Sequence, residues 1–208
     1  MAMIKNDKIP PRVIPRMSRY YRILREYDQK TWISSRELSL DTGFTDAQIR
    51  RDLAYFGQFG QPGKGYIIEE LKKSIKSILG LDRQWNVLLV GVGNLGTALL
   101  RYKGFKEQGF EIVAAVDADS AKAGKIINGI KVYSIGEIQK LVKGKNIHMC
   151  ILTVPENVAQ KAAETAVASG IKSIFNFAPV HLRLPPQVQV RHIDMTIELE
   201  RLSFMSSR

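Results

Sequence analysis

The sequence predicts an α/β protein in which a helical N-terminal part precedes a part built of alternating strands and helices. Up to about residue 80 the apolar residues recur at helical spacing, whereas from Trp85 onward strand-like apolar runs alternate with helical stretches. Three glycines spaced G-x-G-x-x-G directly follow the first of these runs. We therefore expect one domain over residues 1–80, including a connector helix over 69–80, a second over 81–190, and a C-terminal helical segment over 191–208.

The composition is that of a globular protein, and its charge favours a polyanionic partner. Hydrophobic residues make up 45% and charged residues 25% of the 208 residues, with a net charge of +11. An excess of this kind favours association with nucleic acid. The single cysteine, Cys150, lies in an apolar run and is expected to be a small buried hydrophobe, with any other role left open. The start is polar and unlike a signal sequence, and no apolar run approaches the ~20 residues of a membrane span, so we expect a cytoplasmic protein.

An amphipathic helix with many arginines is predicted near the N-terminus. Met17, Tyr20 and Leu24 recur at helical spacing, and Pro15 fits the first turn. Arginines recur every three or four residues along the same segment, and several are expected on one side of the helix, as a solvated face or as phosphate ligands. These arginines are Arg12, Arg16, Arg19, Arg22 and Arg25.

Two helix-start signals follow. Residues 34–37 (SSRE) have the form S-x-x-E, in which the serine caps the helix and the glutamate reaches back. The next helix is short, because residues 41–43 (DTG) form a turn signal. Residues 45–48 (TDAQ) repeat the capping form and open a third helix that runs to about Phe56. Two capped helices joined by a glycine-containing turn predict a helix-turn-helix.

The third helix is predicted to present a face of small and basic residues around Ala47, Arg51 and Ala54, opposite an apolar face. Such a face fits the DNA major groove, where Arg and Gln recognise base edges and basic residues bind phosphate. Residues 57–68 then predict a β-hairpin, so the N-terminal domain is predicted to be a winged helix. The alternative for any one arginine is ordinary solvation. The residues predicted to bind DNA are Arg12, Arg16, Arg19, Ser34, Thr45, Ala47, Gln48, Arg50, Arg51, Tyr55 and Lys64.

The glycines of the second part predict a phosphate-binding turn. A buried-strand run over 86–90 precedes Gly91, Gly93 and Gly96, and a helix over 97–102 follows them, which is the order that such a turn requires. Gly91 permits the tight turn, Gly93 lets the backbone approach a pyrophosphate, and Gly96 lets the helix pack closely on the strand. We therefore expect a Rossmann-type parallel sheet with phosphates at the helix N-terminus.

Asp117 predicts which dinucleotide binds. It ends a second strand over 110–116, where a carboxylate accepts hydrogen bonds from the adenosine ribose hydroxyls. A carboxylate would repel a 2′-phosphate, and no arginine follows in Ala118 and Asp119, so NAD(H) is preferred to NADP(H). The alternative role for Asp117 is a strand-end cap.

Two more strands, over 147–152 and 171–175 with a helix over 158–168 between them, complete the predicted sheet. Ligands of such sheets bind beyond the carboxyl ends of strands, so the loops after these strands are expected to line the nicotinamide half. The residues predicted to bind cofactor are Gly91, Val92, Gly93, Asn94, Leu95, Gly96, Asp117, Thr153, Val154, Pro155, Asn176, Phe177, Ala178 and Pro179.

Catalytic residues and a metal site are not predicted. His148 lies inside a strand run, and His181 and His192 lie in the tail, so none is placed as a general acid. Only about 30 residues follow Pro179, too few for a substrate domain, and residues 195–205 predict an amphipathic helix that needs a partner surface. The alternatives to a DNA-binding protein are a small NAD-dependent oxidoreductase with an accessory N-terminal domain, and a dinucleotide-binding subunit of a larger assembly.

Five segments spread over both predicted domains carry a resemblance to a known family: residues 14–20 (IPRMSRY), 48–57 (QIRRDLAYFG), 91–96 (GVGNLG), 176–179 (NFAP) and 193–196 (IDMT). Over nearly its whole length the sequence resembles the Rex family of bacterial redox-sensing transcriptional repressors. The resemblance implies a non-enzymatic repressor that binds a palindromic operator as a homodimer, exchanges C-terminal helices, and leaves DNA when NADH replaces NAD⁺.

The resemblance also implies roles for single residues. Arg16, Tyr102 and Asp194 match residues that link the DNA-binding domain, the nicotinamide pocket and the partner's swapped helix, so Tyr102 joins the cofactor-binding set. Phe177 and Pro179 would pack near the nicotinamide. The wing differs from the family pattern, because Gln61 and Pro62 stand where adjacent basic residues are usual, which leaves Lys64 as the nearest cation.

Overall fold

The computed structural model describes residues 9–207 of the chain, which divides into two compact units, Met1–Arg83 and Gln84–Arg208. The polar start noted in the sequence lies largely outside the described residues. Within them, no helix is both long and apolar enough to cross a membrane.

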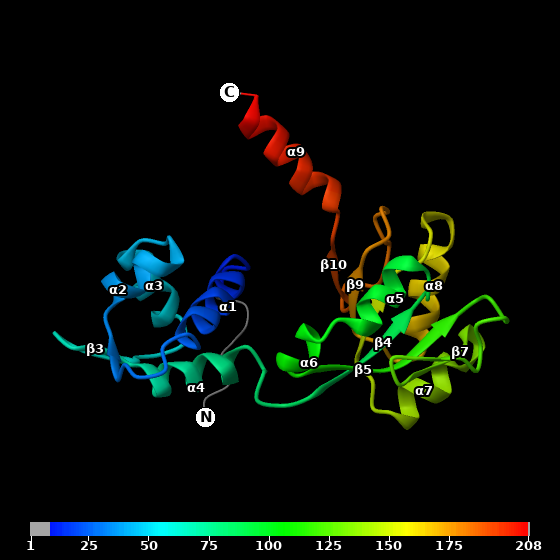
Figure 1. Ribbon diagram of the computed structural model, residues 1–208, viewed down its shortest axis with the longest axis horizontal. Helices are drawn as coiled ribbons and strands as arrows, with labels where there is room; N and C mark the ends of the chain where they lie inside the picture. Colours follow the sequence, from blue (N-terminus) through cyan, green and yellow to red (C-terminus); the bar gives the residue numbers. More distant parts are fainter. Residues whose placement is uncertain (1–8, 208) are drawn as a thin grey trace. The chain divides into compact units, whose positions relative to one another are not determined.

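The first unit is a winged helix (Figure 1). Its small sheet has the order β1-β3-β2 with antiparallel pairs, and the β2–β3 hairpin is the predicted wing. The predicted helices are confirmed, whereas the short strand β1 was not predicted. The elements are α1 (Val13–Leu24), β1 (Trp32–Ile33), α2 (Ser35–Thr42), α3 (Asp46–Ala54), β2 (Gly60–Gln61), β3 (Gly65–Ile67) and α4 (Ile68–Ile78).

Local hydrogen bonds set the ends of α2 and α3. The Ser34 hydroxyl accepts the Glu37 N–H at 3.1 Å and the Glu37 carboxylate accepts the Ser34 N–H at 2.8 Å, which confirms the first capping box. Gly43 ends α2 with a left-handed φ of 71°. Thr45 caps α3 by accepting the Gln48 N–H at 3.2 Å. The Gln48 side chain does not return to Thr45, because it donates to a carboxylate one turn further along α3.

That carboxylate, Asp52, is the centre of a buried polar network that joins α1 to α3. The Arg16 guanidinium donates to both of its oxygens at 2.6 and 2.7 Å, the Tyr20 hydroxyl donates at 2.8 Å, and the Gln48 amide donates at 2.7 Å. The Asp52 side chain is fully buried. Burial alone would raise the pKa of Asp52, but the hydrogen bonds from Arg16, Tyr20 and Gln48 outweigh it and lower the pKa.

The core of the first unit surrounds this network. Met17, Tyr20 and Leu24 of α1 are buried, as predicted, and Ile49 and Leu53 of α3 face them. The predicted connector helix, α4, belongs to the same core, because its buried residues pack in the same cluster. The end of α4 is therefore fixed to the winged helix rather than being a free linker.

The second unit is a Rossmann-type sheet with the order β10-β9-β8-β4-β5-β7-β6, in which β6 alone pairs antiparallel within the described residues. The predicted strands and helices are confirmed, whereas α6, β6, β7, η2, α7 and β10 were not predicted. The elements are β4 (Trp85–Val90), α5 (Asn94–Arg101), α6 (Gly104–Glu107), β5 (Phe110–Asp117), β6 (Ile126–Ile127), β7 (Ile130–Ser134), the 3₁₀ helix η2 (Ile135–Glu137), α7 (Ile138–Gly144), β8 (Met149–Leu152), α8 (Glu156–Ala168), β9 (Ser173–Asn176), β10 (Gln189–His192) and α9 (Met195–Ser206).

Alternate residues of the central strand β4 bury two different clusters. Leu88 and Val90 pack with α7 and α8, whereas Val87 and Leu89 pack with Leu100 of α5 on the other face. The sheet is thus covered on both faces, as parallel sheets are. Cys150 is buried in the α7–α8 layer, as expected, and its burial raises the pKa of the thiol to about 12.

The C-terminal helix α9 has no buried residue. Its apolar side chains Ile197, Leu199, Leu202 and Phe204 are 47–67% exposed. Asp194 caps the helix by accepting the Thr196 N–H at 2.9 Å. An uncovered apolar helix of this kind fits the predicted need for a partner surface.

Replacing Asp52 by Ala should lower the free energy of unfolding of the first unit by about 3 kcal/mol, because it leaves the largely buried Arg16 guanidinium and the Tyr20 hydroxyl without their acceptor. In a Trp85→Phe background Trp32 is the one remaining tryptophan, so its fluorescence in a urea titration reports this unit. Asp46→Ala, which breaks an exposed ion pair on the same helix, is the control and should have a much smaller effect. Equal losses in the two variants would contradict a stabilising role for the buried network.

Candidate functional site

The turn between β4 and α5 brings backbone groups closer than side chains would allow. A Cβ atom on Gly96 would lie 2.1 Å from the Gly91 carbonyl oxygen, and one on Gly91 would lie 2.6 Å from the Thr153 carbonyl oxygen. Gly91 also has a left-handed φ of 95°. Gly93 is different, since within the described residues no atom lies within 4 Å of its would-be Cβ. Gly91 and Gly96 are therefore packing glycines, and Gly93 leaves open space.

The loop after β8 lies against this turn. The Thr153 hydroxyl donates to the Gly91 carbonyl at 2.7 Å, and a Cβ on Gly91 would come within 2.7 Å of Val154. Pro155 forms the cap residue of α8. The structure thus brings the first two loop residues predicted from the sequence to the glycine turn, at the carboxyl ends of β4 and β8.

Asp117, at the end of β5, is tied to the same turn. One of its oxygens accepts the Val92 N–H at 2.6 Å and the Lys122 ammonium at 3.1 Å, and the other accepts the Asp119 N–H at 2.9 Å. Burial alone would raise the pKa of Asp117, but the N–H groups of Asp119 and Val92 and the Lys122 side chain lower it overall. The carboxylate is therefore ionised beside the glycine turn. Sequence reasoning missed Lys122, although a cation five residues after the strand-end acid was a visible signal.

The loop after β9 is held by a buried amide. The Asn176 side chain accepts the Ala178 N–H at 3.0 Å and donates to the carbonyls of Ala178 and Val180 at 3.0 and 3.1 Å. Its amide nitrogen also lies 3.1 Å from Nδ1 of His192 on β10. Since that nitrogen donates, Nδ1 of His192 accepts, and burial together with the stacked His181 ring lowers the pKa of His192. Both histidines are therefore engaged in contacts within this unit.

Phe177 continues this loop toward β8. Its N–H donates to the Leu152 carbonyl at 2.9 Å, and its ring packs edge-on against Phe175 at 4.8 Å between centroids. Pro179 is exposed and Ala178 is buried. The three loops predicted to surround a dinucleotide therefore follow three neighbouring strands, β4, β8 and β9, at one edge of the sheet.

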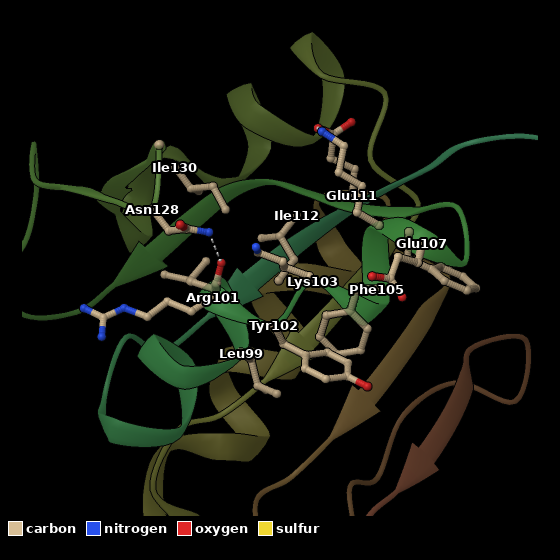
Figure 2. A pocket seen from close by; sticks show the side chains of 14 residues that line it. Leu99, Arg101, Tyr102, Lys103, Phe105, Glu107, Glu111, Ile112, Asn128 and Ile130 are labelled. Atoms are coloured by element: carbon tan, nitrogen blue, oxygen red, sulfur yellow. Dashed lines mark hydrogen bonds and ion pairs between the residues drawn. The ribbon is translucent and has the colours of Figure 1, made fainter.

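Tyr102 lies at the other end of α5 from the glycine turn. It lines a cavity of about 600 Å³ with residues that begin β5, at the amino ends of the strands (Figure 2). Its ring packs edge-on against Phe105, covers Gly104 and is 59% exposed. Within residues 84–207 the structure does not bring Tyr102 to the phosphate-binding end, so its cofactor and coupling roles stay predictions.

The residues predicted to bind DNA fall into two groups in the first unit. Ala47, Arg51 and Ala54 form the exposed face of α3, as predicted, and Tyr55 follows them at 38% exposure. Arg12 and Arg19 are also exposed on and beside α1. Residues of α3 and of the hairpin, with Ser34 and Ser35, line a cavity of about 520 Å³.

The second group is engaged in contacts within the unit. Arg16 is 15% exposed and held by Asp52, and the Gln48 amide binds the same carboxylate. Arg50 donates to Asp46 at 2.7 Å and to Ser35 at 2.9 Å, and Ser34 and Thr45 cap helices. Lys64 on the wing lies over the Trp32 ring, 5.7 Å from its centroid. Arg16 is therefore not part of a free arginine face.

Two family models match the chain, one in each unit. The model described as "Putative DNA-binding protein N-terminus" matches residues 8–54, and the model described as "CoA binding domain" matches residues 82–180. Curated relatives named "Redox-sensing transcriptional repressor Rex" match almost the full length. The protein from Carboxydothermus hydrogenoformans is 44% identical over 97% of this chain and 98% of its own, and that from Desulfitobacterium hafniense is 42% identical over 97% of both chains.

The chain belongs to the Rex family. It is a redox-sensing transcriptional repressor, as the resemblance implied. Solved structures of RSP, a Rex-family repressor, agree with the fold. Its complex with β-NAD⁺ and operator DNA is 37% identical with a TM-score of 0.91, over 95% of this chain and 92% of that one. Its complex with β-NADH is 34% identical with a TM-score of 0.86, over 95% and 94%.

The curated Rex-family relatives are named as transcriptional repressors. In residues 9–207 no group of three or more His, Cys, Asp or Glu side chains could hold a metal. The groups at the sheet edge are backbone N–H groups, one ionised carboxylate and packed aromatic rings. These groups suit binding and orientation of a ligand.

Gly96→Ala should destabilise the second unit by about 2 kcal/mol, because the added carbon overlaps the Gly91 carbonyl and forces α5 from β4. Gly93→Ala is the matched control, since its φ of −84° suits alanine and the space around it is open. In a Trp32→Phe background the fluorescence of Trp85 during urea unfolding measures both. Equal stability of the two variants would show that the close approach at Gly96 is not a constraint.

Proposed function

We propose that this repressor senses the NADH/NAD⁺ ratio, binding operator DNA with NAD⁺ or without ligand and leaving it when NADH binds. The observation that carries the proposal is the open glycine turn beside Asp117, in the same chain as a winged helix with an exposed, basic α3 face. The RSP structures, one with β-NAD⁺ and operator DNA and one with β-NADH, support NAD⁺ and NADH as the two ligands of this site.

The glycine turn supports NAD(H) as the cofactor. Helix α5 begins at Asn94, so the N–H groups of its first turn and the positive end of its dipole face the space left open at Gly93. Leu95 adds a backbone N–H group to this turn, and the N–H group of Val92 ties the turn to Asp117. Asp117 is ionised at the position where a carboxylate accepts ribose hydroxyls, which favours NAD(H) over its 2′-phosphorylated form.

The redox signal is a change of charge on the nicotinamide ring. The ring is positive in NAD⁺ and neutral in NADH, so the polar and aromatic groups of the loops after β8 and β9 can favour a different arrangement for each. Phe177 and Pro179 are the residues that we place beside the ring. Coupling of this kind is reciprocal, so operator DNA weakens NADH binding by the same factor as NADH weakens DNA binding.

The exposed face of α3 supports direct recognition of the operator. Ala47 and Ala54 leave room for close approach to the bases, and Arg51 projects between them as the residue that recognises a base edge. Arg12, Arg19 and Lys64 supply phosphate contacts. Arg16 is assigned a positioning role, since it holds α1 to α3 through Asp52.

We infer a homodimer that exchanges the C-terminal helices and binds a palindromic operator. The exposed apolar residues of α9 support this inference, because their burial requires a further protein surface against which they can pack. Residues 1–80 are assigned to DNA binding, 81–190 to NAD(H) binding and 191–208 to dimerisation. Arg16, Tyr102 and Asp194 are assigned to coupling between these parts, and a repressor of this kind acts in the cytoplasm.

We infer that the chain is not an enzyme. The family supports this directly, and the histidines near the sheet edge stack on each other or bind Asn176. NADH turnover with small carbonyl compounds would favour the oxidoreductase alternative. A stable complex with a different protein and no operator would favour the assembly alternative.

The complex with DNA should be lost when NADH is added and should survive excess NAD⁺. The measurement is fluorescence anisotropy of a labelled palindromic duplex, selected by the protein from a random pool, at fixed salt because phosphate contacts are salt-dependent. Gly93→Ala, which fills the space for the pyrophosphate, should bind the duplex normally and resist release by NADH. Tight NADH binding to the wild type without any effect on DNA would overturn the proposed switch.

Arg51→Ala should weaken operator binding about tenfold or more, because one good contact from Arg to a base contributes about 1–3 kcal/mol of discrimination. NADH affinity should be unchanged, which calorimetry would verify. Lys140→Ala, an exposed cation of the second unit, is the charge-matched control and should leave operator affinity almost unaltered. Equal operator affinity for Arg51→Ala and wild type would remove Arg51 from the recognition face.

A further inference from the structure

Lys122 is placed against Asp117 by a compact turn that follows β5. The Asp119 N–H donates to Asp117, the Ala121 N–H donates to the Asp119 side chain, and the Lys122 N–H donates to the Asp119 carbonyl at 3.1 Å. The chain therefore folds back on itself within five residues. This brings the Lys122 ammonium to 3.1 Å from the Asp117 carboxylate.

The ion pair is partly enclosed and shares its carboxylate oxygen with the glycine turn. The side chains of Asp117 and Lys122 are 11% and 33% exposed, so water screens the pair less than an open surface pair. The same oxygen accepts the Val92 N–H at 2.6 Å. Lys122 is thus connected through one atom to the backbone that would hold the dinucleotide.

The pairing changes how this site discriminates against a 2′-phosphate. A lone carboxylate repels a phosphate by its charge, but here the negative charge of Asp117 is compensated by a cation in direct contact. Exclusion of a 2′-phosphate then depends on the ion pair between Asp117 and Lys122. If the carboxylate is removed, a lysine already positioned at the ribose end is left without its partner, and a 2′-phosphate is a suitable anion for it.

We propose that Lys122 is a specificity-determining residue of the nucleotide site: paired with Asp117 it supports binding of the unphosphorylated ribose of NAD(H), and released from Asp117 it binds the 2′-phosphate of NADP(H). The proposal rests on the proposed function, because it needs a dinucleotide at the glycine turn. It goes beyond the assignment of Asp117, since the preference for NAD(H) over NADP(H) then depends on the ion pair of Asp117 with Lys122.

The test is a double-mutant cycle with Asp117→Asn, Lys122→Met and the double variant, each titrated calorimetrically with NADH and with NADPH. Asp117→Asn keeps a hydrogen-bond acceptor for Val92 and removes the charge, and Asp117→Ala serves as a second variant should the first not fold. Asp117→Asn should weaken NADH binding about tenfold and tighten NADPH binding about tenfold. The gain for NADPH should disappear in the double variant.

Lys122→Met alone should weaken NADPH binding further and leave the uncompensated Asp117 carboxylate to repel it. Lys125→Met is the matched control, because Lys125 is exposed in the same turn and should not change the preference. A gain for NADPH that persists without Lys122, or no gain in either Asp117 variant, would overturn the proposal while wild-type NADH binding still supports the proposed function. Wild-type protein that binds neither nucleotide would overturn both.

Discussion

The approach of Gly96 to the Gly91 carbonyl is the contact on which the nucleotide site depends. It lets α5 begin directly above the end of β4, and Thr153 then bridges to the same carbonyl from the neighbouring strand. A side chain at Gly96 would separate α5 from β4 and displace the N–H groups that we propose to bind phosphate. The position of Asp117 follows from the same contact, because it binds the N–H of the residue after Gly91.

The first unit has a comparable constraint in Asp52. A single buried carboxylate accepts hydrogen bonds from two residues of α1 and one of α3, so the arginine-bearing helix α1 and helix α3 are tied to each other. Removing one partner of such a buried network leaves a charge or polar group unsatisfied. A new partner for the Arg16 guanidinium would compete with Asp52 and so weaken the link between α1 and α3. This competition gives the predicted coupling role of Arg16 a physical basis inside the winged helix.

The sequence predicted what local rules determine and missed what depends on tertiary contacts. The capping box at Ser34 and Glu37 and the glycine turn were found because their signals lie within a few residues. Strands β7 and β10 were missed because they depend on pairing with residues distant in the sequence, Asp117 of β5 and Asn176 of β9 among them. The Arg16–Asp52 pair spans 36 positions, and no periodicity reveals it.

The loop after β9 provides a continuous route from the ligand edge of the sheet toward α9. Asn176 holds the loop that carries Phe177 and also lies against His192 on β10, and two residues later Asp194 caps α9. A ligand can shift an equilibrium between two protein conformations only by its different affinity for each. The neutral and the cationic ring must therefore contact groups whose positions differ between the two conformations. Because the buried Asn176 amide binds both its own loop and His192, a displacement of the loop would be passed on to β10. With the nicotinamide ring beside Phe177, as we propose, a change in its charge would act on the loop that Asn176 links to β10 and so to the cap of α9.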